Sequence, residues 1–568
     1  MQRNPTQLSK VEYDLIVIGG GIYGACIAWD AAQRGLSVAI IERGDFGQET
    51  SANSLKTVHG GLRYLQDFDL NLVRLMIQER SIYLHIAPHL VHPLPCLTPT
   101  YSRLMKSKAV MGMALKLNDF AGYDRNKSLN SDQEIPSSRI FSREDCQVVM
   151  PGLQNVDVTG AALWFDGQIY DTERLTLSFI NSAANAGAEV CNYVAAVGLL
   201  QQDNKVMGVK ARDTITNEDF NIRSRVVVNA AGPWIDGLLE GLNRNSAPRF
   251  RHSLAINIIT RRIVEDYAVG VPSWPDEKSR DGSNQKVSHM LFISPWRNHS
   301  IIGTFHSHFL GDPDKFILEE HSLENIILEA NSAYPSANLE LDDIKFVHHG
   351  FLPEKSNPTD QEVTLVRKSR IIDHRSDEGL SGLISIMGVK YTTARHAAEK
   401  TVDLVFDHLG KTPLPSKTHS TQLYGGQIDH FDAFLSTAIN EDSSLLEPNI
   451  IDHWVRSYGT NYELVKKLLP VSEDQSKLSY RPDRAVYAQV IYAVREEMAI
   501  KLADVILRRT GLGSVGRPDD STLENIAEIM ALELGWSTEK KNLEVEEVKA
   551  IYRKHGLRDR MVDDLESS

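Results

Sequence analysis

The N-terminal segment contains a complete glycine-rich nucleotide-binding pattern. An apolar run ends at Ile18 and is followed by Gly19-x-Gly21-x-x-Gly24, an alanine-rich helical pattern, and a second apolar run that closes on Glu42. Glycines at this spacing allow a tight turn, a close approach of the backbone to a pyrophosphate, and close packing of a helix on a strand. An acid about 20 residues later is placed to bind a ribose hydroxyl. The segment therefore predicts a βαβ unit with an adenine-dinucleotide site.

The length and charge of the chain narrow its class. Its 568 residues exceed what a single core accommodates, so we expect two or three domains. A formal net charge of −14 speaks against a nucleic-acid partner, because proteins with such partners usually carry a basic excess. The polar N-terminus lacks the apolar stretch of a secretory signal, and no run approaches the roughly 18 apolar residues of a spanning helix. We therefore expect a cytoplasmic protein that does not cross a membrane.

The cysteines support an intracellular location. Cys26, Cys96, Cys146 and Cys191 lie far apart in the chain and form no Cys-x-x-Cys pair. This usage predicts buried, reduced thiols in a reducing compartment and no metal site.

Residues 101–117 combine methionine and leucine with cations and contain no acid. The cations are Arg103, Lys106, Lys108 and Lys116. A helix of this composition can lie in a membrane interface, with its apolar face in the lipid and its cations near anionic headgroups. The alternative is a surface helix that packs its methionines and leucines on the core of the protein itself. The sequence leaves both interpretations open.

The remaining periodicity divides the chain into an α/β part and a helical part. We expect helices at residues 70–89, 175–187 and 392–408, a strand at 188–199, a hairpin pair at 205–212 and 218–223, and buried strands at 226–228 and 383–387. Short alternating runs between about 250 and 345 predict an antiparallel sheet. After a proline-containing linker at 411–417, helical periodicity dominates at 462–469, 485–510, 521–534 and 545–555. The fold class we infer is α/β plus helical: a Rossmann-like nucleotide domain interrupted by an antiparallel-sheet substrate domain, with an all-α C-terminal domain.

Segments far along the chain add further strands to the nucleotide domain, and this favours FAD over NAD. A second strand delivers the small-residue turn at residues 229–234, and a third ends at Gly388 immediately before a helix. Such discontinuous chain order is how large flavoproteins wrap an extended FAD. A helix that starts at residues 388–393 would direct its N–H dipoles toward the isoalloxazine edge that becomes negative on reduction. The alternative for Gly388 is a plain strand-to-helix turn.

Motifs along nearly the whole chain resemble those of the FAD-dependent glycerol-3-phosphate dehydrogenases. The resemblance is carried by Thr50-Ser51, Ser54, Lys56, His59-Gly60-Gly61-Leu62-Arg63-Tyr64-Leu65, Phe165-Asp166-Gly167-Gln168, residues 229–234, Gly303-Thr304, Gly311-Asp312-Pro313, Gly388-x-Lys390-x-Thr392-Thr393 and Arg508-Arg509-Thr510. They occur in the order of the family.

The resemblance implies an enzyme that oxidises sn-glycerol 3-phosphate to dihydroxyacetone phosphate with noncovalent FAD. Electrons would pass to a membrane quinone or another acceptor, such as oxygen. The protein would be peripheral on the inner face of the cytoplasmic membrane, in contact through residues 101–117, and a homodimer. The expected division is an oxidoreductase region at 1–410, with FAD-binding parts at about 1–90, 150–245 and 345–410 and substrate parts at about 91–149 and 246–344. The helical domain would occupy 411–568.

The resemblance also assigns candidate site residues. Arg63, Arg367 and Lys390 would line the substrate pocket and hold the phosphate. His59 is the best candidate for the general base, because imidazole titrates near neutral pH, although it could instead fix the loop. Tyr64 would donate a hydrogen bond to the substrate or serve as a packed aromatic. The candidate cofactor-binding residues are Gly19, Gly21, Gly24, Glu42, Thr50, Ser51, Ser54, Lys56, Gly60, Gly61, Ala231, Gly232, Gly388, Thr392 and Thr393.

The chain departs from the family pattern at two places. At one of them Phe305 and His306 follow Thr304, where the family has Thr-Asp. Leu352 stands where the family has an arginine in a Ser-Gly-Val-Arg-Pro-like turn. Loss of a guanidinium from a phosphate contact would weaken transition-state binding on the order of 10²-fold. Neighbouring His348, His349, Lys355 or Arg370 could compensate. Otherwise the substrate is another polyol phosphate, a hydroxy acid or an amino acid. A third hypothesis is a flavoprotein that has lost catalysis and serves as a binding subunit.

Overall fold

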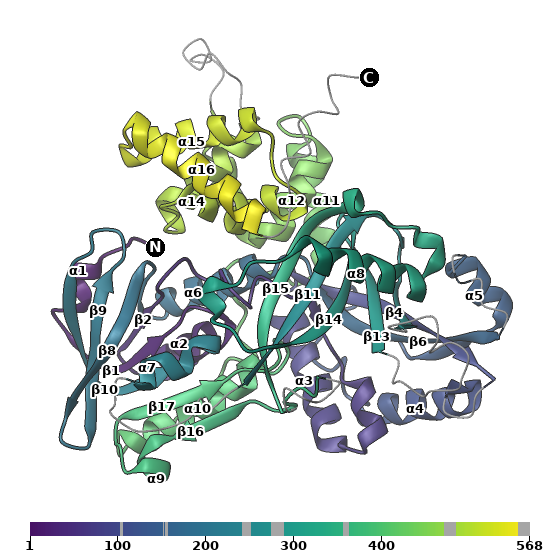
Figure 1. Cartoon of the computed structure of the whole chain (residues 1–568), viewed down its shortest axis with the longest axis horizontal. Coiled ribbons are helices and arrows are strands. Elements are labelled where there is room, and N and C mark those ends of the chain that lie inside the picture. The colour runs from purple at the N-terminus through teal and green to yellow at the C-terminus, as the bar shows by residue number, and fades with distance from the viewer. Residues whose placement is uncertain are drawn as a thin grey trace.

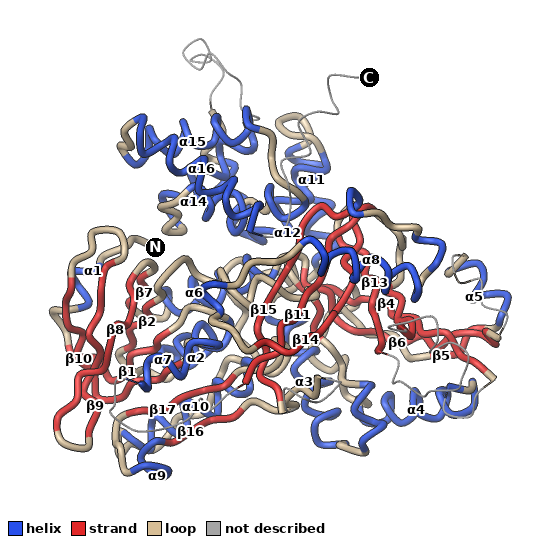
Figure 2. Tube along the Cα trace, viewed as in Figure 1, coloured by secondary structure: helices blue, strands red, loops and turns tan. Residues whose placement is uncertain are grey.

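Two β-sheets lie side by side, and a group of helices from the C-terminal part of the chain packs against them (Figure 1). The computed structural model describes residues 1–102, 106–151, 153, 157–240, 251–273, 289–355, 363–470 and 484–554. Figure 2 shows that strands are confined to the two-sheet part and that the C-terminal group is helical. The position of Arg103 lies outside the described residues.

The first sheet is built around the N-terminal strand. Its order is β16-β17-β10-β1-β2-β7, with β8 and β9 added at β10. Strand β1 runs parallel to both neighbours, and its last residue, Ile18, is in register with Asn229 on one side and Ile41 on the other. The bounds are β1 Glu12–Ile18, β2 Val38–Ile41, β7 Glu189–Cys191, β8 Val194–Gln202, β9 Lys205–Asp213, β10 Asp219–Asn229, β16 Arg370–Asp373 and β17 Leu383–Met387. This is the Rossmann-like sheet that the sequence predicts.

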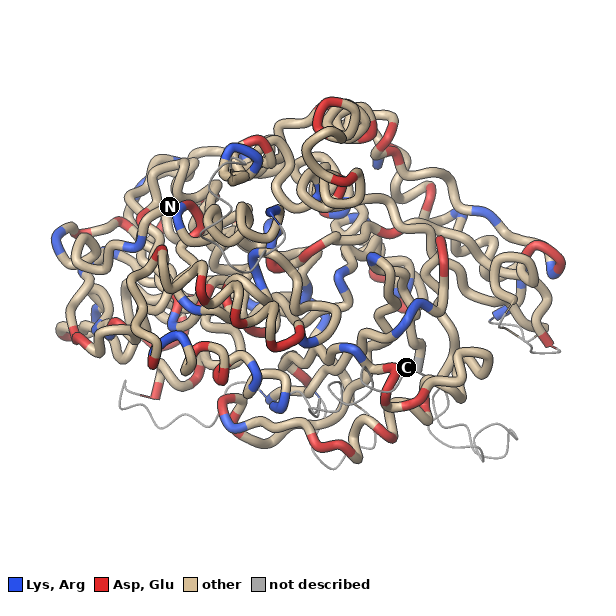
Figure 3. The backbone as a smooth tube through the Cα atoms, turned by 90° about the horizontal axis from the view of Figure 1, so that it is seen from above, with Lys and Arg blue, Asp and Glu red and all other residues tan. Residues whose placement is uncertain are grey.

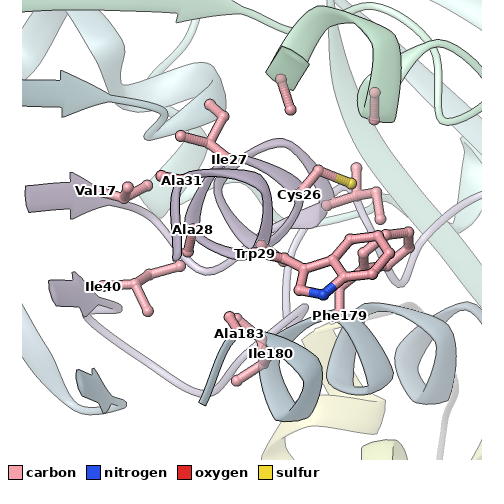
Figure 4. Packing of buried hydrophobic residues seen from close by; sticks show 14 of the residues in the cluster. Val17, Cys26, Ile27, Ala28, Trp29, Ala31, Ile40, Phe179, Ile180 and Ala183 are labelled. Carbon is pink, nitrogen blue, oxygen red and sulfur yellow. The ribbon is translucent and has the colours of Figure 1, made fainter. Parts of the chain in front are cut away.

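Helix α2 (Ile22–Gln33) is buried almost all round, between this sheet and two further helices, α6 (Thr172–Asn185) and α10 (Ala394–His408). Figure 4 shows the packing, in which the Trp29 ring meets Phe179 edge-on at 5.4 Å between ring centroids. Helix α2 packs very closely on the end of β1, the strand that precedes it. A Cβ added at Gly24 would lie 1.9 Å from the carbonyl oxygen of Gly19. The third glycine of the pattern is therefore required by helix-on-strand contact.

The second sheet belongs to the domain that lies beside the nucleotide sheet. Its order is β15-β11-β14-β13-β12-β4-β6-β3, with β5 added at β6, and its pairs are antiparallel apart from β12 with β4. The bounds are β3 Thr57–Val58, β4 Val91–Tyr101, β5 Arg139–Phe141, β6 Val158–Ile169, β11 Arg251–Arg261, β12 Ala268–Ser273, β13 His289–Trp296, β14 His299–Phe309 and β15 Ile344–Glu354. Strand β3 belongs to the predicted flavin loop, so this sheet begins at the nucleotide site.

Helices complete both domains and form the C-terminal group. Around the sheets lie α1 Pro5–Leu8, a 3₁₀ turn Leu62–Asp67, α3 Leu70–Ile86, α4 Lys108–Ala121, α5 Arg143–Val149, α7 Ile235–Glu240, α8 Glu320–Ala333 and α9 His374–Glu378. The C-terminal group comprises α11 Phe431–Asp442, α12 Pro448–Tyr458, α13 Tyr462–Lys466, α14 Arg484–Glu496, a π-helical turn Asp504–Arg509, α15 Asp520–Leu534 and α16 Thr538–Lys554. The four cysteines are buried and unpaired, as their spacing predicts.

A buried ion cluster joins the C-terminal group to the nucleotide sheet. Asp45, which is fully buried in the loop after β2, accepts two hydrogen bonds from Arg509, both at 2.8 Å, and one from Arg508 at 2.6 Å. Arg508 also contacts Asp504 at 2.7 Å. Burial alone would raise the pKa of Asp45, but the two guanidinium groups outweigh it and hold the pKa below its usual range.

Three predicted elements are interrupted or displaced. The expected strand at 188–199 is two strands, because Tyr193 adopts a left-handed φ of 55° and Asn192 bonds to Asp45. The expected helix at 485–510 breaks after Glu496, where Glu497 turns inward to Arg174 at 2.7 Å. The segment at 101–117 is not one helix, since β4 ends at its first residue and α4 begins at Lys108.

The contact at Gly24 generates a first prediction. We expect Gly24→Ala to push α2 off β1, to abolish retention of bound FAD, and to lower the free energy of unfolding by about 2 kcal/mol or more. Flavin absorbance of the purified protein and thermal unfolding measure both effects. Gly35→Ala is the matched control, because Gly35 has a φ of 81° but open space around a Cβ. It should cost about 1 kcal/mol and leave the flavin in place, and equal losses in both variants would contradict the prediction.

Candidate active site

The glycine-rich turn and Glu42 form a cradle of the kind a dinucleotide needs. The carboxylate of Glu42 accepts hydrogen bonds from the N–H of Gly20 at 2.7 Å and of Gly44 at 2.8 Å. Burial raises the pKa of Glu42, although these backbone N–H groups partly oppose the shift. Gly21 caps α2 without a side chain of its own, so a phosphate can approach the backbone at this helix end closely. These residues fit FAD: the helix end and bare glycine backbone would hold the pyrophosphate, and Glu42 the ribose.

The predicted flavin loop, residues 50–61, is tied to both neighbouring parts of the site. The Ser51 hydroxyl accepts a hydrogen bond from the N–H of Ile22 at 3.0 Å, in the first turn of α2. The Thr50 hydroxyl accepts one from Phe351 on β15 at 3.4 Å. The loop therefore bridges the nucleotide helix and the second sheet.

The side chain of Lys56 is held inside the protein. Its side chain is fully buried, and its ammonium donates to Glu173 at 2.7 Å and to Thr172 at 3.0 Å, both in α6. Its backbone N–H donates to the Ser54 hydroxyl at 3.2 Å. The buried carboxylate of Glu173 holds the Lys56 side chain, so both Lys56 and Ser54 fix the loop from within, and a contact of Lys56 with the cofactor stays a prediction for its backbone.

His59 is held by a carboxylate that was not among the predicted site residues. Its Nδ1 lies 3.0 Å from Oδ2 of Asp166 on β6, and its backbone N–H donates to the Thr392 hydroxyl at 3.0 Å. Asp166 also accepts the N–H of Gly60 at 2.6 Å and lies 3.7 Å from Arg80. Burial alone would raise the pKa of Asp166, but contacts with His59 and Arg80 outweigh it and lower the pKa. A charged Asp166 favours the His59 tautomer that carries its proton on Nδ1, leaving Nε2 as an acceptor.

The predicted substrate cations form one cluster. Arg63 and Lys390 lie over the ring of Tyr64, at 5.4 Å and 5.1 Å from its centroid. The ammonium of Lys390 donates to the backbone carbonyl of Arg367. Burial and the charges of Arg63 and Arg367 lower the pKa of Lys390 to about 8. Asp67 pairs with Arg367 at 3.0 Å and partly neutralises the cluster. In a protein of net charge −14, whose acidic and basic segments are interspersed (Figure 3), this is a local concentration of positive charge.

Residues 229–234 lie beside the glycine-rich turn, and residues 388–393 lie beside the flavin loop. Ala231 donates its N–H to the side chain of Asn229 at 3.2 Å, and Gly232 adopts a left-handed φ of 58°. Residues 388–393 lead from the end of β17 into α10, with Thr393 at the N-cap and Thr392 against His59. The structure thus brings residues 388–393 together with the flavin loop.

Leu352 lies on the face of β15 that is turned toward the flavin loop. On that face a Cβ at Gly350 would touch the Thr50 methyl at 3.1 Å, and His348 lies 3.1 Å from Asn53. Side chains alternate along a strand, so Leu352 shares this face. His349 points to the other face and packs on Phe316, with 5.0 Å between ring centroids. Of the two histidines suggested as substitutes for the family arginine, only His348 lies on the side of the loop.

Sequence reasoning missed Asp166 and Tyr23 as members of this region. Asp166 lay in a quoted motif but had no role, because nothing local pairs it with His59. Tyr23 lies inside the glycine-rich pattern, and its hydroxyl contacts the backbone of Lys390. No periodicity signals a contact between residues so far apart in the chain.

The fold and this site together define a flavin-binding oxidoreductase, and comparison with known proteins gives the family. Residues 14–404 match the model of the FAD dependent oxidoreductase family, and residues 416–541 match the C-terminal domain of alpha-glycerophosphate oxidase. A glycerol-3-phosphate dehydrogenase from Synechocystis is 31% identical over 96% of this chain and 97% of that protein. An aerobic glycerol-3-phosphate dehydrogenase from Staphylococcus aureus is 29% identical, with 95% and 94% covered.

A solved structure agrees with these relatives. The glycerol-3-phosphate dehydrogenase of Bacillus halodurans, complexed with FAD, superposes with a TM-score of 0.76 at 25% identity and covers 97% of this chain and 96% of its own. The chain therefore belongs to the FAD-dependent glycerol-3-phosphate dehydrogenase family. It is an FAD-dependent oxidoreductase.

The lowered pKa of Lys390 generates a prediction about anion binding. Lys390 carries its proton below about pH 8 and loses it above. We therefore expect the affinity for sulfate, whose own charge stays constant, to fall about tenfold or more as pH rises through 8. Sulfate titrations followed by the flavin absorbance, at pH values on either side of 8, measure the effect. Lys390→Met should bind weakly at every pH, and a pH step that survives in this variant would contradict the assignment.

Proposed function

We propose that this enzyme oxidises sn-glycerol 3-phosphate to dihydroxyacetone phosphate. The observation that carries the proposal is the cluster of Arg63, Arg367 and Lys390 around Tyr64, beside a histidine held by a carboxylate. Cations of this kind suit a phosphate, and a histidine suits the removal of a hydroxyl proton. Family membership supports the same substrate class.

Each part of the reaction has a candidate group in this chain. Bound FAD supplies the acceptor for the hydride that leaves the secondary carbon. Nε2 of His59 takes the hydroxyl proton, and Asp166 stabilises the resulting imidazolium through Nδ1. Arg63, Arg367 and Lys390 bind the phosphate and so orient the C–H bond. Tyr64 supports the cations with its ring face, on which Arg63 and Lys390 lie.

The substrate is tested by anaerobic mixing with the oxidised enzyme. We expect glycerol 3-phosphate to bleach the flavin absorbance rapidly, and His59→Asn to slow the bleaching at saturating substrate by about 10²-fold because the base is lost. Phe292→Leu is the control, since the Phe292 ring packs beside His59 with 6.2 Å between centroids and carries no proton acceptor. Unaltered bleaching in His59→Asn would contradict the assigned base.

A second candidate function follows from Leu352. A leucine on the face toward the flavin loop weakens the grip on a phosphate and favours a different small anionic donor, such as a polyol phosphate, a hydroxy acid or an amino acid. Bleaching by such donors but not by glycerol 3-phosphate would establish it. Leu352→Arg would then raise kcat/KM for glycerol 3-phosphate by about tenfold or more, whereas no change would show that other groups already hold the phosphate.

We also propose a peripheral position on the inner face of the cytoplasmic membrane, with a quinone as electron acceptor. Among the described residues, no helix is both long enough and apolar enough to cross a bilayer. Helix α4 presents Met113, Leu117 and Phe120 to solvent at helical spacing, and Met113 and Phe120 are 74% and 76% exposed. Phe68, which is 83% exposed, precedes the neighbouring helix α3. An apolar helix face beside exposed Lys116 fits an interface with anionic lipid.

Flotation with anionic vesicles tests the membrane contact. We expect the double variant Met113→Ser, Phe120→Ser to lose most vesicle binding while it keeps its FAD, because the exposed apolar anchors are removed. Leu532→Ser is the control, since Leu532 is 70% exposed on the C-terminal group, away from α4. Equal flotation of the double variant and the unmodified protein would remove the proposal.

A further inference from the structure

Tyr23 carries a hydroxyl that reaches from the nucleotide helix to the substrate cations. It lies in the first turn of α2, between the second and third glycines of the pattern. Its oxygen accepts hydrogen bonds from the N–H groups of Val389 at 3.0 Å and Lys390 at 3.2 Å, and it donates to the Lys390 carbonyl at 2.8 Å. A phenol has one donor and two acceptor positions, so these three bonds use its full capacity.

The ring of Tyr23, like its hydroxyl, is in close contact with the chain that leads to Lys390. A Cβ added at Gly388 would lie 2.5 Å from Cε2 of Tyr23, so the ring rests directly on the backbone at Gly388. Ring and hydroxyl together fix the chain from Gly388 to Lys390 on α2. The backbone from which the Lys390 ammonium extends is therefore set by a residue of the glycine-rich pattern.

The same hydroxyl lies next to the second cation-bearing segment. Oγ of Ser369 is 2.9 Å from the Tyr23 oxygen, close enough to exchange with one of its other partners. Ser369 follows Arg367 by two residues, and the Lys390 ammonium donates to the Arg367 carbonyl. The segments that carry Arg367 and Lys390 thus converge on one phenolic oxygen.

We infer that Tyr23 is a positioning residue for the anion-binding cluster of Arg63, Arg367 and Lys390. It holds Lys390 and Arg367 in one fixed arrangement before an anion arrives, so that binding does not have to order them. The inference rests on the proposed role of these cations in holding the anionic end of the substrate. It adds that the dinucleotide helix, besides its nucleotide role, sets the geometry of the substrate site.

Tyr23→Phe tests the inference, because it keeps the ring over Gly388 and removes only the hydroxyl. The probe is inorganic phosphate, titrated into the oxidised holoenzyme and followed by flavin absorbance and by calorimetry. We expect about tenfold weaker phosphate binding with unchanged FAD content. Tyr83→Phe is the matched control, since the Tyr83 hydroxyl donates to the Tyr391 carbonyl at 3.2 Å, in the same segment but not at a cation. It should change phosphate affinity by less than about twofold.

A double-variant cycle separates positioning from general loosening of the fold. In a Lys390→Met background, Tyr23→Phe should change phosphate affinity much less than it does in the native enzyme, because the group it positions is absent. An equal loss in both backgrounds, or a loss of FAD on Tyr23→Phe, would overturn the inference. If Tyr23→Phe binds phosphate as the native enzyme does, the inference about Tyr23 fails, but the proposed anion site of Arg63, Arg367 and Lys390 is unaffected. If the native enzyme does not bind phosphate at all, the proposed anion site fails and the inference with it.

Discussion

The buried contact of Asp45 with Arg508 and Arg509 is the constraint on which the arrangement of the molecule depends. It joins the loop that follows β2 to the π-helical turn of the C-terminal group. A carboxylate and two guanidinium groups without access to water are stable only together, and removal of one partner typically costs about 3–5 kcal/mol. The Asp45 loop begins at Glu42 and contains Phe46, against which Gly20 packs. The helical region thus holds the loop that carries Glu42 through these charged hydrogen bonds to Asp45.

The sequence alone predicts those helices and strands that are determined by the residues within them. The unit β1-α2-β2 follows from apolar runs and glycine spacing alone, and the helix at α10 follows from its periodicity. The sequence predicts one strand at 188–199 because most of its residues are apolar. It breaks at Asn192 and Tyr193, where a side-chain bond to Asp45 and a left-handed residue redirect the chain. Such a break depends on tertiary partners that periodicity does not contain.

In the candidate site, too, some residues can be predicted from the sequence and others cannot. His59, Arg63 and Lys390 could be named because each lies in a short motif with a resemblance. Asp166 could not be assigned as the partner of His59, nor Glu173 as the partner of Lys56, since each partner lies far along the chain. Residues within a motif can therefore be predicted, whereas their hydrogen-bond partners depend on how the two sheets pack in the folded protein. For Leu352, the structure gives the orientation toward the loop, whereas its difference from the family is what the resemblance implies.

The position of β1 has a consequence for biosynthesis. One edge of β1 pairs with β2, which follows it directly, but the other pairs with β10 at residues 219–229, and β17 joins only at 383–387. At translation speeds of about 5–20 residues per second, the second hydrogen-bonding edge of the first strand stays unpaired on the order of tens of seconds. The loop at residues 388–393, which meets the flavin loop through Thr392 and His59, is made later still. These parts of the site therefore cannot come together before about two thirds of the 568 residues have been synthesised.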